Sequence, residues 1–496
     1  MPRTKKTAQP TSSAKTAKSA VTIRMYNPGF GDCFLLTFQG SDGNPRYMLI
    51  DCGVHQRVKN GSPKIDLIVK DIAAVTRNHL NILAVTHEHA DHISGFKSAQ
   101  ETFEQITIDD LWLAWTEDPN DPQAKKLKNG IKQGVEELTA AVHKLKATNL
   151  QAGSALEGLL QFEVPSTELG VTRSALDFLR ERSKKKLSKP EDYRRPGEAP
   201  LTIPGVTGVK VYVLGPPLDL ASFRVTEKES EMYPEFAAIN ASQAFTAALK
   251  VGESNLSKED ENIVKRSFPF EKHYDMTPGR AKIDPDYQDF FRQYYGFTKD
   301  TGQGDAWRRI EDDWLDSASE LALKINNMTN NTSLVLAFEL TDSDPHKVLL
   351  FVGDAQVGNW LSWPMVHWGD GTQGNEKITG EDLLQRTVFY KVGHHGSRNA
   401  TLREKGLELM DDAKLVAMIP VDQQWALDVM DWHHPALKLL DALEKKTKNR
   451  LLRADRIPAV SETLPEPDNL AADEWQQFMN HVRWDTENKL WIEYTI

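Results

Sequence analysis

Cysteine and long apolar runs are scarce in this sequence of 496 residues. The two cysteines, Cys33 and Cys52, cannot form a disulfide framework or a cysteine-rich zinc site, so we expect reduced thiols in a cytoplasmic protein. Apolar stretches such as "NILAVT" and "LLFVG" fall far short of the roughly 20 residues that cross a bilayer. We therefore expect no membrane partner.

Basic residues are also in the minority, with 60 Lys and Arg against 71 Asp and Glu and a net charge of −11. This balance disfavours generic nucleic-acid binding, which depends on neutralising phosphates, although a local basic patch leaves nucleic acid open as a partner. The first 20 residues contain no acid and no apolar core of the kind found in a secretory signal. We expect residues 1–20 to form a disordered basic tail.

Strand and helix patterns alternate along the rest of the chain. "VTIRMYN", "CFLLTFQ" and "YMLIDCG" predict antiparallel strands, and a helical pattern and the buried strand "NILAVT" follow. Residues 119–328 are mostly helical in pattern, with one strand predicted near 208–214. Strand patterns return in 329–496, and the chain ends in a predicted hairpin. The alternation predicts an α/β layered fold in which 119–328 is an insertion between the two halves, 21–118 and 329–496.

Histidines are few as well, 14 in all, yet "LAVTHEHADHISGF" places three of them within six positions. If the preceding strand continues, His87 and His89 would aim at one point, because alternate residues of a strand face the same side. Asp91 and His92 can reach a second point beside it. We therefore predict two divalent metal ions, Zn²⁺ by preference and Mn²⁺ or Fe²⁺ as alternatives, which share a hydroxide.

The spacing His-x-His-x-Asp-His resembles the signature of the metallo-β-lactamase fold superfamily. "LIDCG" and "LLFVGDA" resemble two further strands of that fold, which contribute Asp51 and Asp354. "GFGDCFLL", "NNTSLVL", "YKVGHHGS" and the later "HHP" resemble a narrower branch, which includes competence-type DNA-uptake hydrolase domains and phosphorylcholine esterases. The resemblance covers about residues 21–118 and 330–445 and implies a four-layer αββα sandwich.

The resemblance also implies a set of metal ligands. They would be His87, His89 and His395 at the first metal, Asp91, His92 and His434 at the second, and Asp354 between the two. Many members take a first-site histidine from the segment before the "SLVL" strand. Here that segment, "NMTNNTS", contains none, so the first metal depends on the ligand from "GHHGS".

The two histidines of "GHHGS" leave an alternative open. We favour His395 as the ligand, and His394 would then face the substrate and stabilise charge or donate a proton. The catalytic residues would be Asp91, His394 and Asp32, the last of which orients the site, contacts substrate or caps a turn. Asp51 is expected to hold a ligand in place.

Three functions are consistent with these motifs. The first is a dinuclear metal phosphodiesterase, either a nuclease or an esterase of a smaller phosphodiester. The second is a hydrolase of the same fold that acts on a lactone, thioester or amide. The third is a degenerate member whose insertion serves as a protein-binding or regulatory module. A fold does not choose among substrates, but the "GHHGS" branch favours phosphodiesters.

Overall fold

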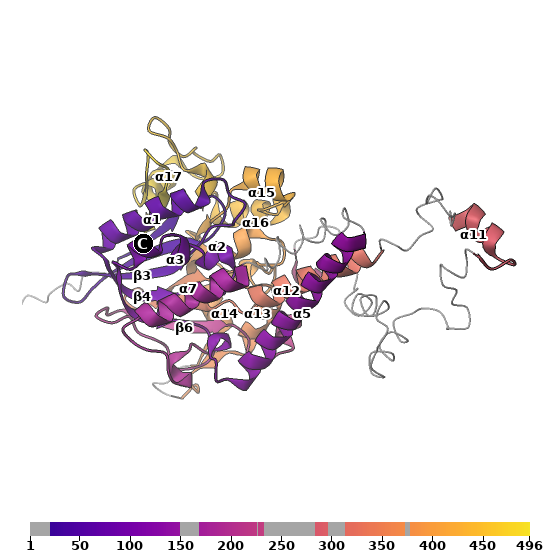
Figure 1. Ribbon diagram of the computed structural model, residues 1–496. Helices are drawn as coiled ribbons and strands as arrows, with labels where there is room; N and C mark the ends of the chain where they lie inside the picture. The colour runs from indigo at the N-terminus through magenta and orange to yellow at the C-terminus, as the bar shows by residue number, and fades with distance from the viewer. Residues whose placement is uncertain (1–19, 149–167, 226, 233–282, 296–312, 373–376) are drawn as a thin grey trace, which may run out of the picture.

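The computed structural model describes residues 20–148, 168–225, 227–232, 283–295, 313–372 and 377–496. Apart from Ala20, the tail predicted at 1–20 lies outside these ranges, as do the intervening parts of 119–328. Two large sheets carry the described chain (Figure 1). None of the helices in these ranges combines the length and apolar character needed to cross a bilayer.

The first sheet has seven strands in the order β14-β15-β1-β2-β3-β4-β5. Their bounds in that order are Val482–Trp484, Trp491–Thr495, Val21–Tyr26, Cys33–Gln39, Pro45–Cys52, His79–Ala84 and Thr107–Trp112. All neighbours are antiparallel except β3-β4 and β4-β5, which are parallel. The predicted C-terminal hairpin is the β14-β15 pair, and it completes this sheet beside β1. Both cysteines are free and buried, and they face each other across β2 and β3.

The second sheet has six strands in the order β13-β12-β11-β8-β7-β6. Their bounds are Leu451–Arg453, Val416–Ile419, Thr387–Lys391, Lys347–Phe351, Val335–Leu340 and Val209–Gly215. β13 to β8 are parallel, whereas β8-β7 and β7-β6 are antiparallel. The edge strand β6 falls where the sequence predicts a strand near 208–214. A separate two-stranded sheet pairs β9 (His367–Trp368) with β10 (Ile378–Thr379).

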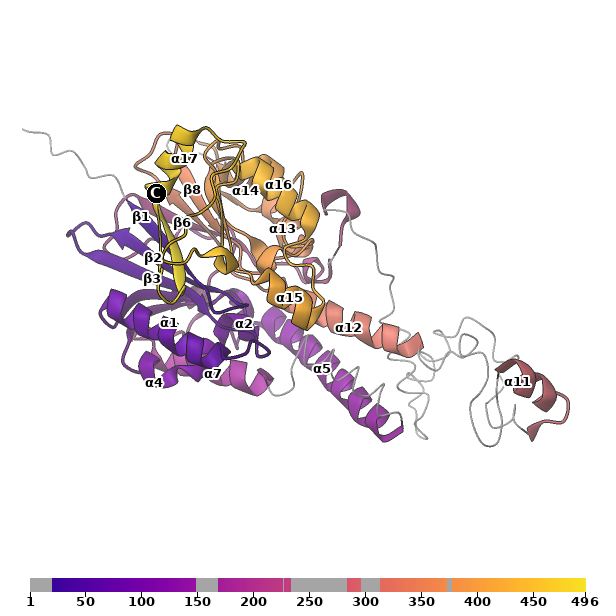
Figure 2. The same cartoon turned by 90° about the horizontal axis from the view of Figure 1, so that it is seen from above.

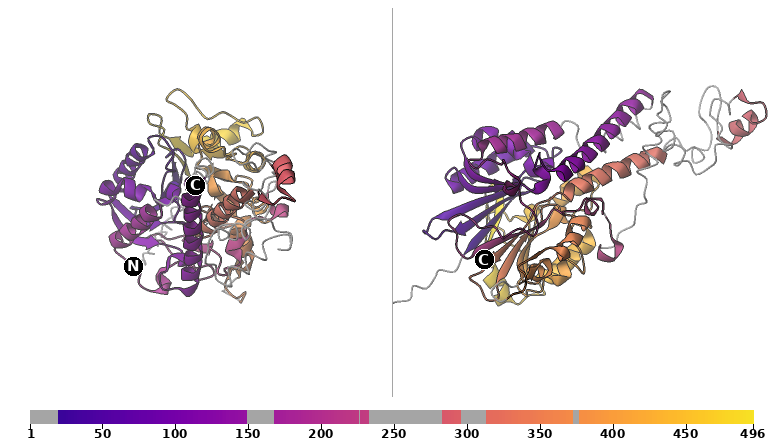
Figure 3. Two further views of the ribbon diagram at one scale, coloured as in Figure 1. Left: turned by 45° about the vertical axis from the view of Figure 1, so that its right-hand side comes forward. Right: turned by 90° about the horizontal axis from the view of Figure 1, so that it is seen from below.

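The two large sheets pack face to face, and helices cover their outer faces (Figure 3). Phe34 of β2 meets Phe351 of β8 edge to face, with ring centroids 5.8 Å apart. α1 (Gly61–Thr76) presents Ile65, Ile68 and Ile72 to the first sheet at helical spacing. On the other side, α13 (Val357–Ser362), α14 (Gly380–Gln385) and α16 (Leu437–Thr447) cover the second sheet. The protein is thus an α/β sandwich of two mixed sheets.

Two long helices of the insertion run side by side away from the sandwich (Figure 2). They are α5 (Pro122–Thr148) and α12 (Asp313–Asn330). Gly134 of α5 allows this close approach, because a Cβ there would lie 2.6 Å from a methyl carbon of Ile325. The other α-helices within the described ranges are α2 (Ala90–Ile93), α3 (Gly95–Ser98), α4 (Gln100–Phe103), α7 (Glu168–Arg182), α11 (Gln288–Tyr295), α15 (Gln423–Met430) and α17 (Ala472–Met479).

Candidate metal centre

His87 and His89 lie in a loop, because β4 ends at Ala84, and Asp91 and His92 lie in the short helix α2 that follows. The strand does not continue as far as the two histidines, so strand alternation does not align them. The loop nevertheless brings the two imidazoles together, with His87 Nε2 and His89 Nδ1 3.0 Å apart. Two imidazole nitrogens at this separation could contact one ion.

Glycines let two other loops approach the motif closely. The backbone N–H of Asp32 donates to the carbonyl of Asp91 over 2.9 Å. A Cβ on Gly53 would lie 2.3 Å from the carbonyl carbon of Asp91, and one on Gly31 would lie 2.7 Å from its oxygen. Real Cβ atoms are not found so close to backbone, so the sequences "GFGDC" and "LIDCG" are needed in this form to position Asp91 and His92.

Asp354 follows β8 and lies at the middle of the cluster. Its Oδ2 is 3.1 Å from His92 Nε2, 4.0 Å from His87 Nε2 and 3.8 Å from His394 Nε2. Neither Asp354 Oδ2 nor His92 Nε2 has a hydrogen-bond partner, although both are buried. The two buried atoms thus have only each other as a close partner, and they are near enough to be ligands of one cation.

The "GHHGS" segment has an unusual backbone. His394 and His395 adopt φ values of 43° and 52°, in the left-handed region that non-glycine residues rarely occupy. Such conformations cost on the order of 1–3 kcal/mol each and persist where the surroundings impose them, often at functional sites. Here they direct the two imidazoles differently: His395 Nε2 lies 2.9 Å from Asp91 Oδ2, and His394 Nδ1 lies 3.2 Å from Gln356 Nε2.

This geometry differs from the predicted grouping of ligands. His395 was expected with His87 and His89, but it lies against Asp91. His434 was expected with Asp91; the structure places it beside His394, with ring centroids 5.7 Å apart and a buried Nδ1 that has no hydrogen-bond partner. The assignment of each histidine to a particular metal stays a prediction.

Four buried side chains of the centre come close together. A ligand atom from each of Asp32, His92, Asp354 and His395 lies within 4.8 Å of the other three, and all four residues are buried. Such a group could hold a metal ion. Unpartnered buried atoms on His89, His92, His434, Asp32 and Asp354 fit the same interpretation, because a cation would satisfy them.

Asp51 lies behind His92 and fixes its ring. Its Oδ2 is 2.8 Å from His92 Nδ1, and it accepts hydrogen bonds from the backbone and hydroxyl of Thr86 at 2.8 and 2.6 Å. The neighbouring ring of His395 is held from behind as well, because its Nδ1 donates to the carbonyl of Pro420 over 2.6 Å. Both imidazoles therefore present Nε2 to the centre, as a supported metal ligand does. Glu88 points elsewhere and pairs with Lys128.

Lys391 is a site residue that the sequence reasoning missed. Its side chain is 2% exposed, forms a close ion pair with Asp32, lies 3.6 Å from Asp354 Oδ1 and donates to the carbonyl of Gly353 over 2.8 Å. Burial alone lowers the pKa of Lys391, but Asp32 and Asp354 outweigh it and raise the pKa. The sequence does contain a signal for this residue, because Lys391 is the only charged residue in the predicted strand "TVFYKV". Asp32, expected to orient the site, contact substrate or cap a turn, is buried against this ammonium group.

The imidazoles fall into two protonation classes. Burial lowers the pKa of four of them: His87, His89, His394 (to about 4) and His434. For His92 and His395 burial acts in the same direction, but nearby carboxylates, chiefly Asp354 and Asp91, outweigh it and raise the pKa. Desolvation raises the pKa of Asp354 less than the surrounding cationic groups lower it. The metal-free centre thus combines four imidazoles that favour the neutral form, two that favour the protonated form, and the ionised carboxylates of Asp91 and Asp354 at neutral pH.

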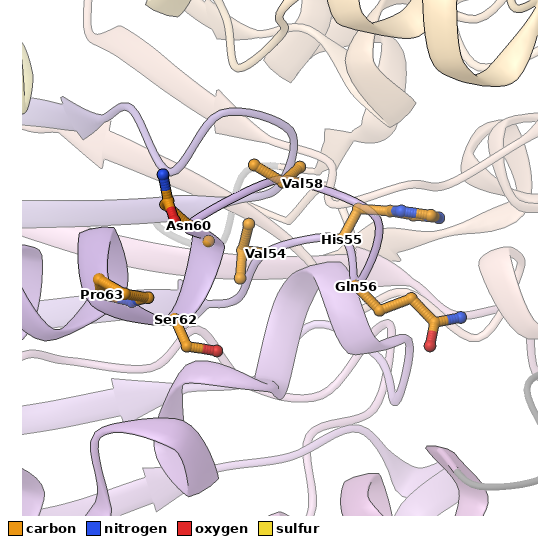
Figure 4. A pocket seen from close by; sticks show the side chains of 8 residues that line it. Val54, His55, Gln56, Val58, Asn60, Ser62 and Pro63 are labelled. Atoms are coloured by element: carbon orange, nitrogen blue, oxygen red, sulfur yellow. The ribbon is translucent and has the colours of Figure 1, made fainter.

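A pocket of about 280 Å³ lies beside the centre, in the loop between β3 and α1 (Figure 4). Its lining includes Val54, His55, Gln56, Val58, Asn60 and Ser62, and none of these is a predicted ligand. His55 connects it to the centre through Phe30, whose ring lies 6.3 Å from His55 and 4.2 Å from His395.

Comparison with protein-family models, curated proteins and solved structures found no match to this chain.

Proposed function

We propose that this chain is a dinuclear metal-dependent hydrolase of the metallo-β-lactamase fold superfamily. Among the substrate classes considered, we favour phosphodiesters over lactones, thioesters and amides. The observation that carries the proposal is the pair of unpartnered ligand atoms, His92 Nε2 and Asp354 Oδ2, 3.1 Å apart in a buried site. Each atom has only the other as a close partner, and a cation bound between them would satisfy both.

Divalent ions bound here would act as Lewis acids and make a water molecule reactive at neutral pH. The chain provides His87 and His89 on one side, and Asp91, His92 and His395 on the other. The carboxylate Oδ2 of Asp354 lies between the two sets, 4.0 Å from His87 Nε2 and 3.1 Å from His92 Nε2. This arrangement supports two adjacent ions that share Asp354.

His394 is suited to stabilising charge on the substrate. Gln356 Nε2 can donate to His394 Nδ1 over 3.2 Å, which places the imidazole proton on Nε2. Burial lowers the pKa of His394 to about 4, so its ring is neutral at pH 7. A neutral imidazole donates a hydrogen bond to a developing oxyanion rather than releasing a proton. Of the two roles expected for His394, charge stabilisation is the better supported.

The preference for phosphodiesters derives from the sequence resemblance of "YKVGHHGS" and "HHP". The geometry of the site is equally suited to the hydrolysis of an acyl compound such as a lactone, thioester or amide. Phosphodiesterase activity is tested by measuring the hydrolysis of bis(p-nitrophenyl) phosphate by metal-stripped protein refilled with Zn²⁺ or Mn²⁺. Asp354→Asn should abolish turnover, whereas Asp473→Asn, at an exposed position of α17, should leave it unchanged.

Turnover that survives in Asp354→Asn would contradict the proposal, because the reaction would then not depend on the shared carboxylate. If the refilled protein holds two metals and leaves the phosphodiester intact, trials with lactones, thioesters and amides would follow. If it holds no metal, a binding role for the insertion would replace hydrolysis.

A further inference from the structure

The segment that joins α12 to β7 lies against the metal centre. Its sequence "NNTS", residues 330–333, contains no histidine, so any contribution to the centre is of another kind. The backbone N–H of Leu334 donates to the carbonyl of Thr86, directly before the histidine motif, over 2.9 Å. The start of β7 is therefore attached to the loop that carries His87.

Ser333 has no exposed surface, and its hydroxyl contacts two of the predicted ligands at once. Its Oγ accepts a hydrogen bond from the backbone N–H of Asp354 over 3.0 Å and lies 3.4 Å from His87 Nδ1. One side chain from a third segment thus joins the histidine motif to the end of β8, where the shared carboxylate follows.

The hydrogen bonds of Thr86 determine which ring nitrogen of His87 carries the proton. Thr86 donates its single hydroxyl proton to Asp51 Oδ2 over 2.6 Å. The same hydroxyl oxygen lies 3.1 Å from His87 Nδ1, where it can only accept, so Nδ1 is the donor. Ser333 Oγ faces this nitrogen as a second acceptor. His87 Nε2, on the side of Asp354 Oδ2, therefore keeps its lone pair for a metal ion.

The backbone before Asp354 approaches the serine closely. Gly353 has a φ of 55°, and a Cβ at this position would lie 3.1 Å from both Cβ and Oγ of Ser333. A residue with a side chain would be strained in this conformation and would crowd the hydroxyl. Glycine at 353 thus allows the backbone N–H of Asp354 to reach Ser333 Oγ.

We propose that Ser333 is a positioning residue of the metal centre, which holds the His87 ring and the Asp354 backbone in one arrangement. This inference rests on the proposed metal-dependent function and gives a role to the segment that contains no histidine. A group that hydrogen-bonds a metal ligand from behind orients it and keeps its lone pair available. Because Ser333 contacts two ligands, its loss should disturb both.

Zinc binding measures this role without any assay of activity. In calorimetric titration of metal-stripped protein, Ser333→Ala should bind Zn²⁺ about 10–100-fold more weakly than wild type. Ser343→Ala is the matched control, because Ser343 Oγ also accepts from a backbone N–H, that of Lys347, over 2.9 Å. Ser343 lies between β7 and β8 at the end of these strands that is remote from the centre.

A cobalt spectrum separates positioning from general destabilisation. The visible absorption bands of protein-bound Co²⁺ depend on the identity and geometry of its ligands. At saturating Co²⁺, Ser333→Ala should shift or weaken these bands, and Ser343→Ala should leave them as in wild type. A serine that only stabilises the fold would lower the unfolding temperature of the apo protein without changing the spectrum of the folded, loaded protein.

An unchanged cobalt spectrum in Ser333→Ala, with two ions bound by the wild type, would overturn this role and leave the proposed function standing. Wild-type protein that binds no ion would overturn both. If Ser333→Ala does not fold, Ser333→Cys decides the matter, because a thiol occupies a similar space but is a weak acceptor. Ser333→Cys should then weaken Zn²⁺ binding, and unchanged or tighter binding would overturn the role.

Discussion

Replacement of Lys391 by methionine should destabilise the metal-free protein strongly. Lys391 and Asp32 form an ion pair in which both side chains are 2% exposed, and Asp354 Oδ1 lies 3.6 Å from the same ammonium group. Methionine fills most of the volume but removes the charge and the hydrogen bond to Gly353. The carboxylate of Asp32 would then be buried without its main counter-ion.

The magnitude follows from this loss of compensation. Breaking a buried ion pair by removing one partner costs about 3–5 kcal/mol, since the remaining charge stays desolvated. Asp32→Asn removes that charge, so the double variant with Lys391→Met should be about 1–3 kcal/mol more stable than the sum of the single effects. A bound divalent ion next to Asp32 should offset part of the loss in Lys391→Met.

Urea unfolding in EDTA at pH 7, followed by tryptophan fluorescence, measures these free energies. Lys70→Met is the matched control, because the ion pair of Lys70 and Asp66 lies on the surface with exposures of 60% and 40%. Surface pairs contribute less than about 1 kcal/mol. A loss below about 1 kcal/mol in Lys391→Met would refute the view that this pair holds the centre together.

Further predictions concern the loops and imidazoles around the centre. Gly53→Ala should reduce metal affinity and also lower the thermal stability of the apo protein, because the new Cβ displaces the backbone of Asp91. Calorimetric titration with Zn²⁺ measures the affinity, and unaltered affinity would exclude the steric argument. Asp51→Ala should weaken metal binding about 10–100-fold in the same titration, since the ring of His92 loses its support. Metal binding at pH 7 should release protons, because His92 and His395 have raised pKa values and must be neutral to bind an ion. An indicator dye in weak buffer would detect this release, which should decline as the pH rises above those pKa values; uptake instead of release would contradict it.

Much of the sheet order could not be derived from the sequence, but the elements themselves could. Alternating apolar residues in "VTIRMYN" and helical spacing at 64–78 predict β1 and α1, because local periodicity reflects which face is buried. The end of β4 was misplaced, since "AVTH" has the same pattern whether it continues as a strand or enters a loop. The loop is set by tertiary contacts, including the hydrogen bond from Thr86 to Asp51.

For the metal centre, too, the sequence predicts the local chemistry but not the arrangement of segments that are far apart in the chain. The spacing of His87, His89, Asp91 and His92 predicts metal-binding chemistry within one short segment. The position of His395 beside Asp91 depends on the left-handed backbone of "GHHGS" and on packing between segments far apart in the sequence. Lys391 was missed for a related reason, because its role appears only when its burial and its ion pair with Asp32 are known.

The most direct test of the account is the metal content of the purified chain. Metal-stripped wild-type protein is incubated with Zn²⁺ or Mn²⁺, desalted and analysed by inductively coupled plasma mass spectrometry, beside Asp354→Asn. The account predicts two ions per wild-type chain and at most one in the variant, because the carboxylate of Asp354 lies between the two sets of ligands. Wild-type protein without bound metal, or a variant that retains both ions, would contradict it.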